Sequence, residues 1–104
     1  VGVCWDFGHA NLAANDQNES LKLIGKRLKA THVNDNDKLK DRHLLPFYGV
    51  IEWEPIMKTL KEIDYQGDFT FEITPFLDRV PPVIRQKALE HTVEVGNYLI
   101  SLAK

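Results

Sequence analysis

Three residues able to bind a metal ion, Asp6, His32 and Glu72, each stand at the polar end of a short β-prone run. Parallel sheets gather their chemistry at the carboxyl ends of the strands, where such residues meet on one edge. Carboxylate and imidazole ligands together suit Zn, Mn, Fe or Co, and a carboxylate-rich mixture favours the harder of these ions. Taken singly, an acid after a strand is more often a helix cap or a solvated end. As a series of three strand ends, these residues predict a divalent-metal site with room for water or substrate oxygens.

His9, Asp41 and His43 form a second candidate set. His9 follows Asp6 closely enough to share the same pocket mouth. Asp41 and His43 are separated by one residue, so their side chains point to the same side of an extended loop. A second metal ion is one interpretation of this spacing. The alternative is that His9 only contacts substrate while Asp41 and His43 brace the loop.

Three strands and three helices are predicted to position these residues. Each pair of strands is separated by a helix-length segment, and such long connections require parallel neighbours, because a hairpin needs only a few linking residues. The predicted fold class is therefore α/β, a parallel β-α-β-α-β-α segment. The predicted strands are 1–6, 29–33 and 68–73, and Thr74-Pro75 ends the last one. The first predicted helix runs from a capping box at Asp16 and Glu19 to near Leu28, the second from Pro55 to Ile63, and the third from Pro81-Pro82 almost to the C-terminus. The predicted loops are 7–18 and 34–49.

The composition is that of one soluble globular domain, or part of one, spanning residues 1–104. The net charge of −2 and the pI of about 6.1 give no electrostatic reason to expect nucleic acid as a partner. No apolar run approaches the roughly 20 residues of a membrane-spanning helix, and no signal peptide precedes the first strand. We therefore expect a cytoplasmic protein without a membrane partner. Cys4, inside the first apolar run, is expected to be a small buried hydrophobe.

The predicted sheet has bare edges. Three helices cannot cover both of its faces, and an open edge of apolar strand invites aggregation. We expect either that the chain is part of a larger barrel or sheet, or that self-association with another copy completes it. Val1 already lies inside the predicted first strand, as it would in a processed or truncated product. A missing N-terminal part is therefore one candidate for covering the edges.

Short motifs surround the candidate residues over almost the whole chain up to Glu72. They are Val3-Cys4-Trp5-Asp6-Phe7-Gly8-His9-Ala10-Asn11, Thr31-His32-Val33-Asn34-Asp35, Asp41-Arg42-His43-Leu44-Leu45-Pro46 running into Gly49-Val50-Ile51-Glu52-Trp53, Tyr65-Gln66-Gly67 and Phe71-Glu72. In this order and spacing the motifs resemble the xylose isomerase-like TIM barrel superfamily, which includes sugar phosphate isomerases and epimerases and the endonuclease IV branch. The resemblance implies a (β/α)8 TIM barrel of which this chain forms the last three β/α units, a partial barrel.

The resemblance also implies roles for individual residues. Asp6, His32 and Glu72 would be ligands of the main divalent metal, Mn, Zn, Co or Mg. The remaining ligand, a glutamate on an earlier strand, has no counterpart in this sequence. In the epimerases that glutamate is one of two acid/base groups, and Glu72 would be the other. His9 matches a substrate-contacting histidine of the epimerases, whereas in the endonuclease branch His9, Asp41 and His43 match the ligands of a further zinc.

The activity that the resemblance implies is isomerisation or epimerisation of a small-molecule sugar or sugar phosphate. A glutamate removes the proton beside a carbonyl, and the metal stabilises the resulting enediolate as a Lewis acid. Two alternatives stay open. One is an endonuclease IV-like, metal-dependent phosphodiesterase acting on DNA, which the slight negative charge disfavours. The other is a truncated chain without activity of its own, because one of the two catalytic carboxylates is missing.

Overall fold

The computed structural model describes residues 2–13, 16–73 and 77–104. Within these residues three strands alternate with helices, as the sequence predicts. In chain order the elements are β1 (Val3–Asp6), α1 (Phe7–Leu12), α2 (Gln17–Ile24), a 3-10 turn η1 (Gly25–Arg27), β2 (Leu28–Val33), α3 (Trp53–Glu62), β3 (Asp68–Phe71) and α5 (Pro82–Leu102).

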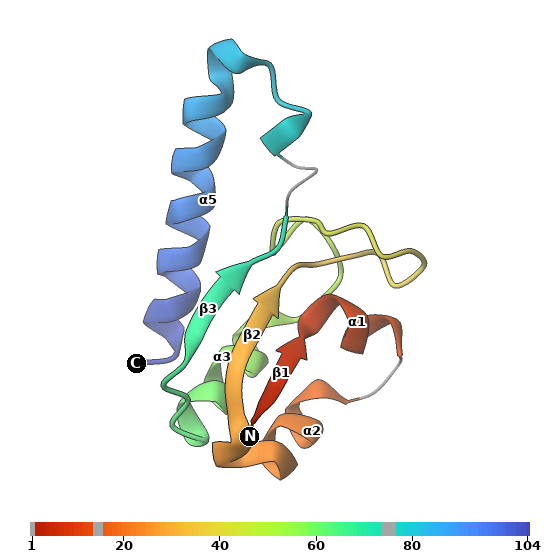
Figure 1. Cartoon of the computed structure of the whole chain (residues 1–104), viewed down its shortest axis with the longest axis vertical. Helices are drawn as coiled ribbons and strands as arrows, with labels where there is room; N and C mark the ends of the chain where they lie inside the picture. The colour runs from red at the N-terminus through yellow and green to blue at the C-terminus, as the bar shows by residue number, and fades with distance from the viewer. Residues whose placement is uncertain (1, 14–15, 74–76) are drawn as a thin grey trace.

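The strands form one open sheet in the order β1-β2-β3, and both pairs are parallel (Figure 1). Asp6 is the register partner of His32, and His32 is the partner of Thr70. All three strands therefore point their carboxyl ends to the same edge of the sheet. The prediction of an α/β fold with parallel strands is confirmed, and the open sheet is what a part of a TIM barrel would have.

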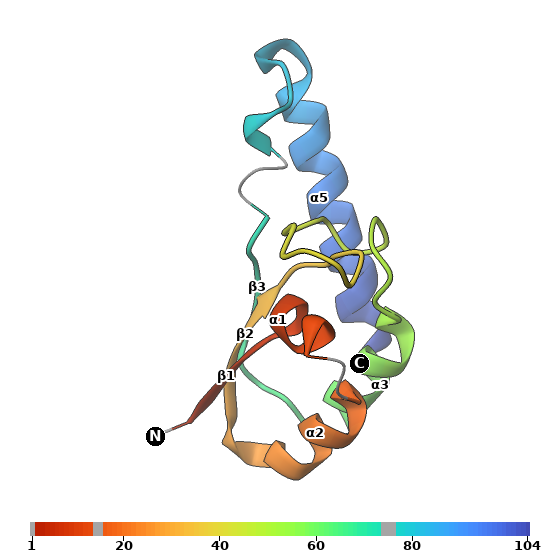
Figure 2. The same cartoon turned by 90° about the vertical axis from the view of Figure 1, so that its right-hand side faces the viewer.

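Helices α2, α3 and α5 lie on one side of the sheet (Figure 2). The register row Trp5, Thr31 and Phe69 belongs to this side, because the Trp5 indole donates a hydrogen bond to Gln17 of α2 and Phe69 packs against the core. Side chains alternate along a strand, so the next residues belong to the opposite side. The buried core on the helix side consists of Phe7, Leu21, Leu28, Val33, Leu45, Ile51, Trp53, Ile56, Met57, Leu60, Ile73, Val95 and Leu99.

The prediction that Cys4 is buried is wrong. Cys4 is exposed, since it belongs to the sheet side opposite the helices. An apolar run by itself does not say whether both faces of its strand are covered.

Two predictions about helices in the N-terminal half are also wrong. Phe7–Leu12 is a helix rather than part of a loop, because the Asp6 carboxylate caps it by accepting the backbone N–H of His9 at 2.9 Å. The capping interaction of Asp16 with the Glu19 N–H is confirmed. The helix that it starts ends at Ile24 instead of near Leu28, since Gly25 takes a positive φ of 54° and ends the helix.

The other predicted boundaries hold more closely. Helix α3 begins at Trp53, two residues before the predicted start at Pro55, and α5 follows Pro81-Pro82 as expected. Strand β3 ends at Phe71 rather than Ile73. The predicted stop at Thr74-Pro75, the predicted strand start at Val1 and residues 14–15 of the predicted first loop lie outside the described residues. No described helix combines the length and the apolar character needed to cross a membrane.

Candidate metal centre

Asp6, His32 and Glu72 converge at the carboxyl edge of the sheet. Asp6 and His32 are register partners, and Glu72 lies two residues beyond Thr70, the partner of His32, so it returns to the same face. The backbone N–H of Glu72 also donates to Val33 at 2.9 Å, which extends the pairing past the end of β3. One ligand atom from each of the three residues lies within 4.8 Å of the other two. The structure thus brings together the first predicted set.

The three side chains fit a divalent cation. Two carboxylates approach one imidazole, with Glu72 Oε2 at 3.1 Å and Asp6 Oδ2 at 3.9 Å from His32 Nδ1. Neighbouring ligands of an octahedral cation, each about 2.1 Å from the metal, lie about 3.0 Å apart, and opposite ligands lie about 4.2 Å apart. The observed spacings are close to this range. Because two carboxylates point at one place, a positive charge there would relieve their repulsion.

The second predicted set also comes together. Asp41 contacts two imidazoles through its two oxygens, with His9 Nε2 at 3.0 Å from Oδ2 and His43 Nε2 at 3.3 Å from Oδ1. A ligand atom from each residue lies within 4.8 Å of the others. The His9 side chain is 62% exposed, whereas that of His43 is 25% exposed. His9 is therefore the member most accessible to an incoming molecule.

The two sets join into one closed ring of alternating acids and imidazoles. His9 links Asp41 to Asp6, because its Nδ1 lies 3.6 Å from Asp6 Oδ2. His43 links Asp41 to Glu72, because its Nδ1 lies 3.5 Å from Glu72 Oε1. His32 closes the ring between Glu72 and Asp6. Three carboxylates concentrated in this way attract cations.

The surroundings of His43 change the proton affinity of its imidazole. Burial by itself would lower the pKa of the imidazole. The hydrogen bond between His43 Nδ1 and the Glu72 carbonyl oxygen, at 2.8 Å, and the nearby carboxylates of Asp41 and Glu72 outweigh burial, so the pKa of His43 rises above 6.5. A carbonyl oxygen can only accept, so His43 Nδ1 carries the proton in this contact.

The loop that carries Asp41 and His43 is held by Asp35, a residue for which the sequence predicted no role. Asp35 is fully buried, and its backbone pairs with Leu44, the neighbour of His43. Its carboxylate accepts four hydrogen bonds, a number that saturates both oxygens. The donors are the backbone N–H groups of Asn36, Phe47 and Ile51 and the indole N–H of Trp53, at 2.8, 3.2, 3.1 and 2.8 Å.

Asn36 ties the same loop to α1. Its amide nitrogen donates to the Gly8 carbonyl at 2.9 Å, and its side-chain oxygen accepts from Asn11 at 2.6 Å. Asn34, Asp35 and Asn36 are all 0% exposed. The sequence signal for this burial was three polar residues in a row directly after an apolar strand. Polar residues after a strand are usually solvated, however, and no local pattern distinguishes a buried triplet from a solvated one.

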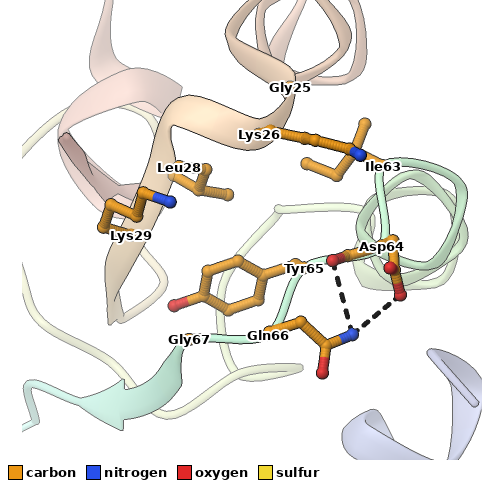
Figure 3. A pocket seen from close by; sticks show the side chains of 9 residues that line it. All are labelled: Gly25, Lys26, Leu28, Lys29, Ile63, Asp64, Tyr65, Gln66 and Gly67. Atoms are coloured by element: carbon orange, nitrogen blue, oxygen red, sulfur yellow. Dashed lines mark hydrogen bonds between the residues drawn. The ribbon is translucent and has the colours of Figure 1, made fainter.

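His91 joins neither set. It lies on α5, where its Nε2 is 3.0 Å from the Tyr48 hydroxyl at the surface. A pocket of about 360 Å³, which Figure 3 shows from close by, lies near the amino ends of β2 and β3. The residues Gly25, Lys26, Leu28, Lys29, Ile63, Asp64, Tyr65, Gln66 and Gly67 line it. Its position at the opposite end of the strands separates it from the candidate chemistry.

Comparisons with known proteins give the wider setting. The chain is 44% identical over 79 residues to the uncharacterized protein y4fM of Sinorhizobium fredii, and this alignment covers 76% of this chain and 25% of that protein. It is 35% identical over 99 residues to the uncharacterized protein MJ1311 of Methanocaldococcus jannaschii, and this alignment covers 93% of this chain and 33% of that protein. The chain therefore spans between a quarter and a third of the length of these relatives.

A solved structure described as a D-tagatose 3-epimerase-like protein matches with a TM-score of 0.62 and 28% identity, covering 93% of this chain and 36% of that one. The model of the xylose isomerase-like TIM barrel family matches residues 1–95. These residues contain all three strands and both candidate ligand sets. The chain belongs to the xylose isomerase-like TIM barrel family.

Proposed function

We propose that this protein is a divalent-metal-dependent isomerase or epimerase that acts on a sugar or a sugar phosphate. The observation that carries the proposal is the closed ring of three carboxylates and three imidazoles at the carboxyl edge of the sheet. Active sites of TIM barrels lie at this edge. The similarity to an epimerase-like structure supports the choice of reaction.

Asp6, His32 and Glu72 are the residues that would hold the cation. When bound, the cation would supply Lewis-acid polarisation of substrate oxygens. Glu72 is the proposed acid/base, because its side chain is 39% exposed and therefore reachable by a substrate while it still faces His32. It would take the proton from the carbon beside the carbonyl, giving an enediolate, or return one. His9, exposed at the rim of the ring, would contact the substrate hydroxyls.

A pocket of about 320 Å³ gives a small molecule space beside the second set. Lys40, Asp41, Arg42, His43, Leu44 and Arg79 line it. This volume is in the lower part of the usual range for small-molecule sites, about 300 to 1,000 Å³.

Turnover should require a second acid/base carboxylate. The family resemblance assigns this role to a glutamate on an earlier barrel strand, which has no counterpart among the described residues. We therefore propose that activity belongs to a longer form of the protein, in line with the greater length of the matched relatives. The same additional segment, or a second copy, would cover the strand edges of the open sheet.

One observation favours a second candidate function. His9, Asp41 and His43 meet in the way that a zinc ligand set of the endonuclease IV branch would require. A phosphodiesterase would use such ions to activate water against a DNA backbone. The net charge of −2 argues against this function, because DNA affinity comes largely from neutralised phosphates.

A direct assay separates these functions. The 104-residue chain and the full-length gene product should be incubated with Mn²⁺, Co²⁺, Zn²⁺ or Mg²⁺ and a panel of ketoses and their phosphates. We expect metal-dependent conversion by the longer form. Cleavage of DNA at abasic sites without sugar conversion would favour the nuclease, and failure of the full-length protein in both assays would contradict the proposal.

A further inference from the structure

Asn34 is a fully buried amide that touches the candidate metal ligand Asp6. Its side-chain nitrogen donates to Asp6 Oδ1 at 3.3 Å, and the residue is 0% exposed. It directly follows β2, one residue beyond Val33, so the central strand that supplies His32 also supplies this contact. Asn34 therefore lies just past the end of the strand that carries His32, two residues from this proposed ligand.

The two oxygens of Asp6 have different surroundings. Oδ1 accepts the backbone N–H of His9 at 2.9 Å in addition to the Asn34 amide. Oδ2 faces the imidazoles, at 3.6 Å from His9 Nδ1 and 3.9 Å from His32 Nδ1. Two donors thus occupy one oxygen and direct the other toward the place where the ligand atoms converge.

The orientation of Asn34 is constrained on its other side. Its oxygen Oδ1 is buried and has no hydrogen-bond partner among the described residues. A Cβ atom added to Gly8 would lie 1.8 Å from this oxygen, so only a glycine leaves space for the amide. Turning the amide over would place its oxygen against Asp6 Oδ1, where two acceptors would repel each other. An unpartnered buried acceptor lowers stability, which indicates that the contact with Asp6 serves the site.

We infer that Asn34 is a positioning residue that reserves Oδ1 of Asp6 and presents Oδ2 as its single metal-binding oxygen. This inference rests on the proposed metal-dependent function. Carboxylates bind cations through one or both oxygens. With a single oxygen from Asp6, one donor each from His32 and Glu72, and the expected further glutamate, two of roughly six coordination positions stay open for two substrate oxygens. If Asp6 chelated through both oxygens, one of those positions would be lost.

The test uses Mn²⁺ as the probe in the full-length gene product. Asn34→Leu removes the amide donor and keeps the number and branching of the side-chain heavy atoms, and Asn34→Ala removes the donor without adding bulk. Asn97→Leu is the matched control, since Asn97 is exposed on α5. Two quantities should be measured: the Mn²⁺ dissociation constant, and the number of exchangeable waters on bound Mn²⁺ from water-proton relaxation at one ion per chain.

We expect about two waters on the wild-type ion, about one fewer in the Asn34 variants, and an affinity change of the order of 10-fold or more. A merely structural role would alter stability without removing a water. Unchanged hydration and affinity in a folded Asn34 variant would overturn this inference alone. If both variants fail to fold, the wild-type count decides, since one water or none contradicts single-oxygen binding. A wild-type protein that does not bind Mn²⁺ would overturn the proposed function as well.

Discussion

Replacing Asp35 with asparagine should destabilise the loop that carries Asp41 and His43. Each Asp35 oxygen accepts two hydrogen bonds, and an amide nitrogen in place of either oxygen would face two N–H donors instead. A buried donor that loses its acceptor costs about 1–3 kcal/mol, so the loss is about 2–6 kcal/mol before the relief from removing a buried charge. Since total stabilities are about 5–15 kcal/mol, this single-atom change should be conspicuous.

The assay for Asp35→Asn is equilibrium urea denaturation followed by tryptophan fluorescence. Trp53 is a suitable reporter, because its indole N–H donates directly to Asp35 Oδ2. Asp78→Asn is the matched control at an exposed position, where we expect a change within about 0.5 kcal/mol. If Asp35→Asn is no more destabilising than the control, Asp35 does not organise the loop and the account given for the placement of His43 is wrong.

Three further predictions concern the site and its support. His32→Ala should abolish metal-dependent turnover and reduce metal occupancy in the full-length protein, because it removes the donor between Asp6 and Glu72; elemental analysis measures the occupancy. Gly8→Ala should destabilise the fold by about 1–3 kcal/mol in thermal denaturation, since its methyl group would overlap the Asn34 amide. The backbone N–H of Leu39 and the Arg42 guanidinium lower the pKa of Asp37 to about 2, so Arg42→Ala should raise that pKa toward 3.8 in an NMR titration.

Unchanged metal content in His32→Ala would remove His32 from the ligand set. A Gly8→Ala protein as stable as wild type would mean that the Asn34 amide can move aside. For Asp37 the lowered pKa means that its charged form contributes stability above about pH 3.8, and that the contribution is lost as the pH falls through about 2. An Asp37 pKa that does not respond to Arg42→Ala would contradict the assigned cause.

Local pattern was sufficient to predict the parallel architecture and to predict that the candidate ligands lie together. Strand-length and helix-length segments alternate, which forces parallel pairing, and parallel pairing brings strand-end residues to one edge. For this reason the sequence groups Asp6, His32 and Glu72, and in the structure one ligand atom of each lies within 4.8 Å of those of the other two. Asp41 and His43 also lie together, as predicted, although His43 has a positive φ of 51° instead of the extended backbone that the prediction assumed.

Tertiary structure decided which side chains are buried and which atom of each one faces the site. Helix α1 forms where loop composition was expected, because the Asp6 side chain caps it. The burial of Asn34, Asp35 and Asn36 follows from the path of residues 34–51 over the strand ends, and Cys4 is exposed because its sheet face is uncovered. Sequence periodicity indicates which face of its own helix or strand a side chain lies on, whereas burial depends on the other segments that pack against that face.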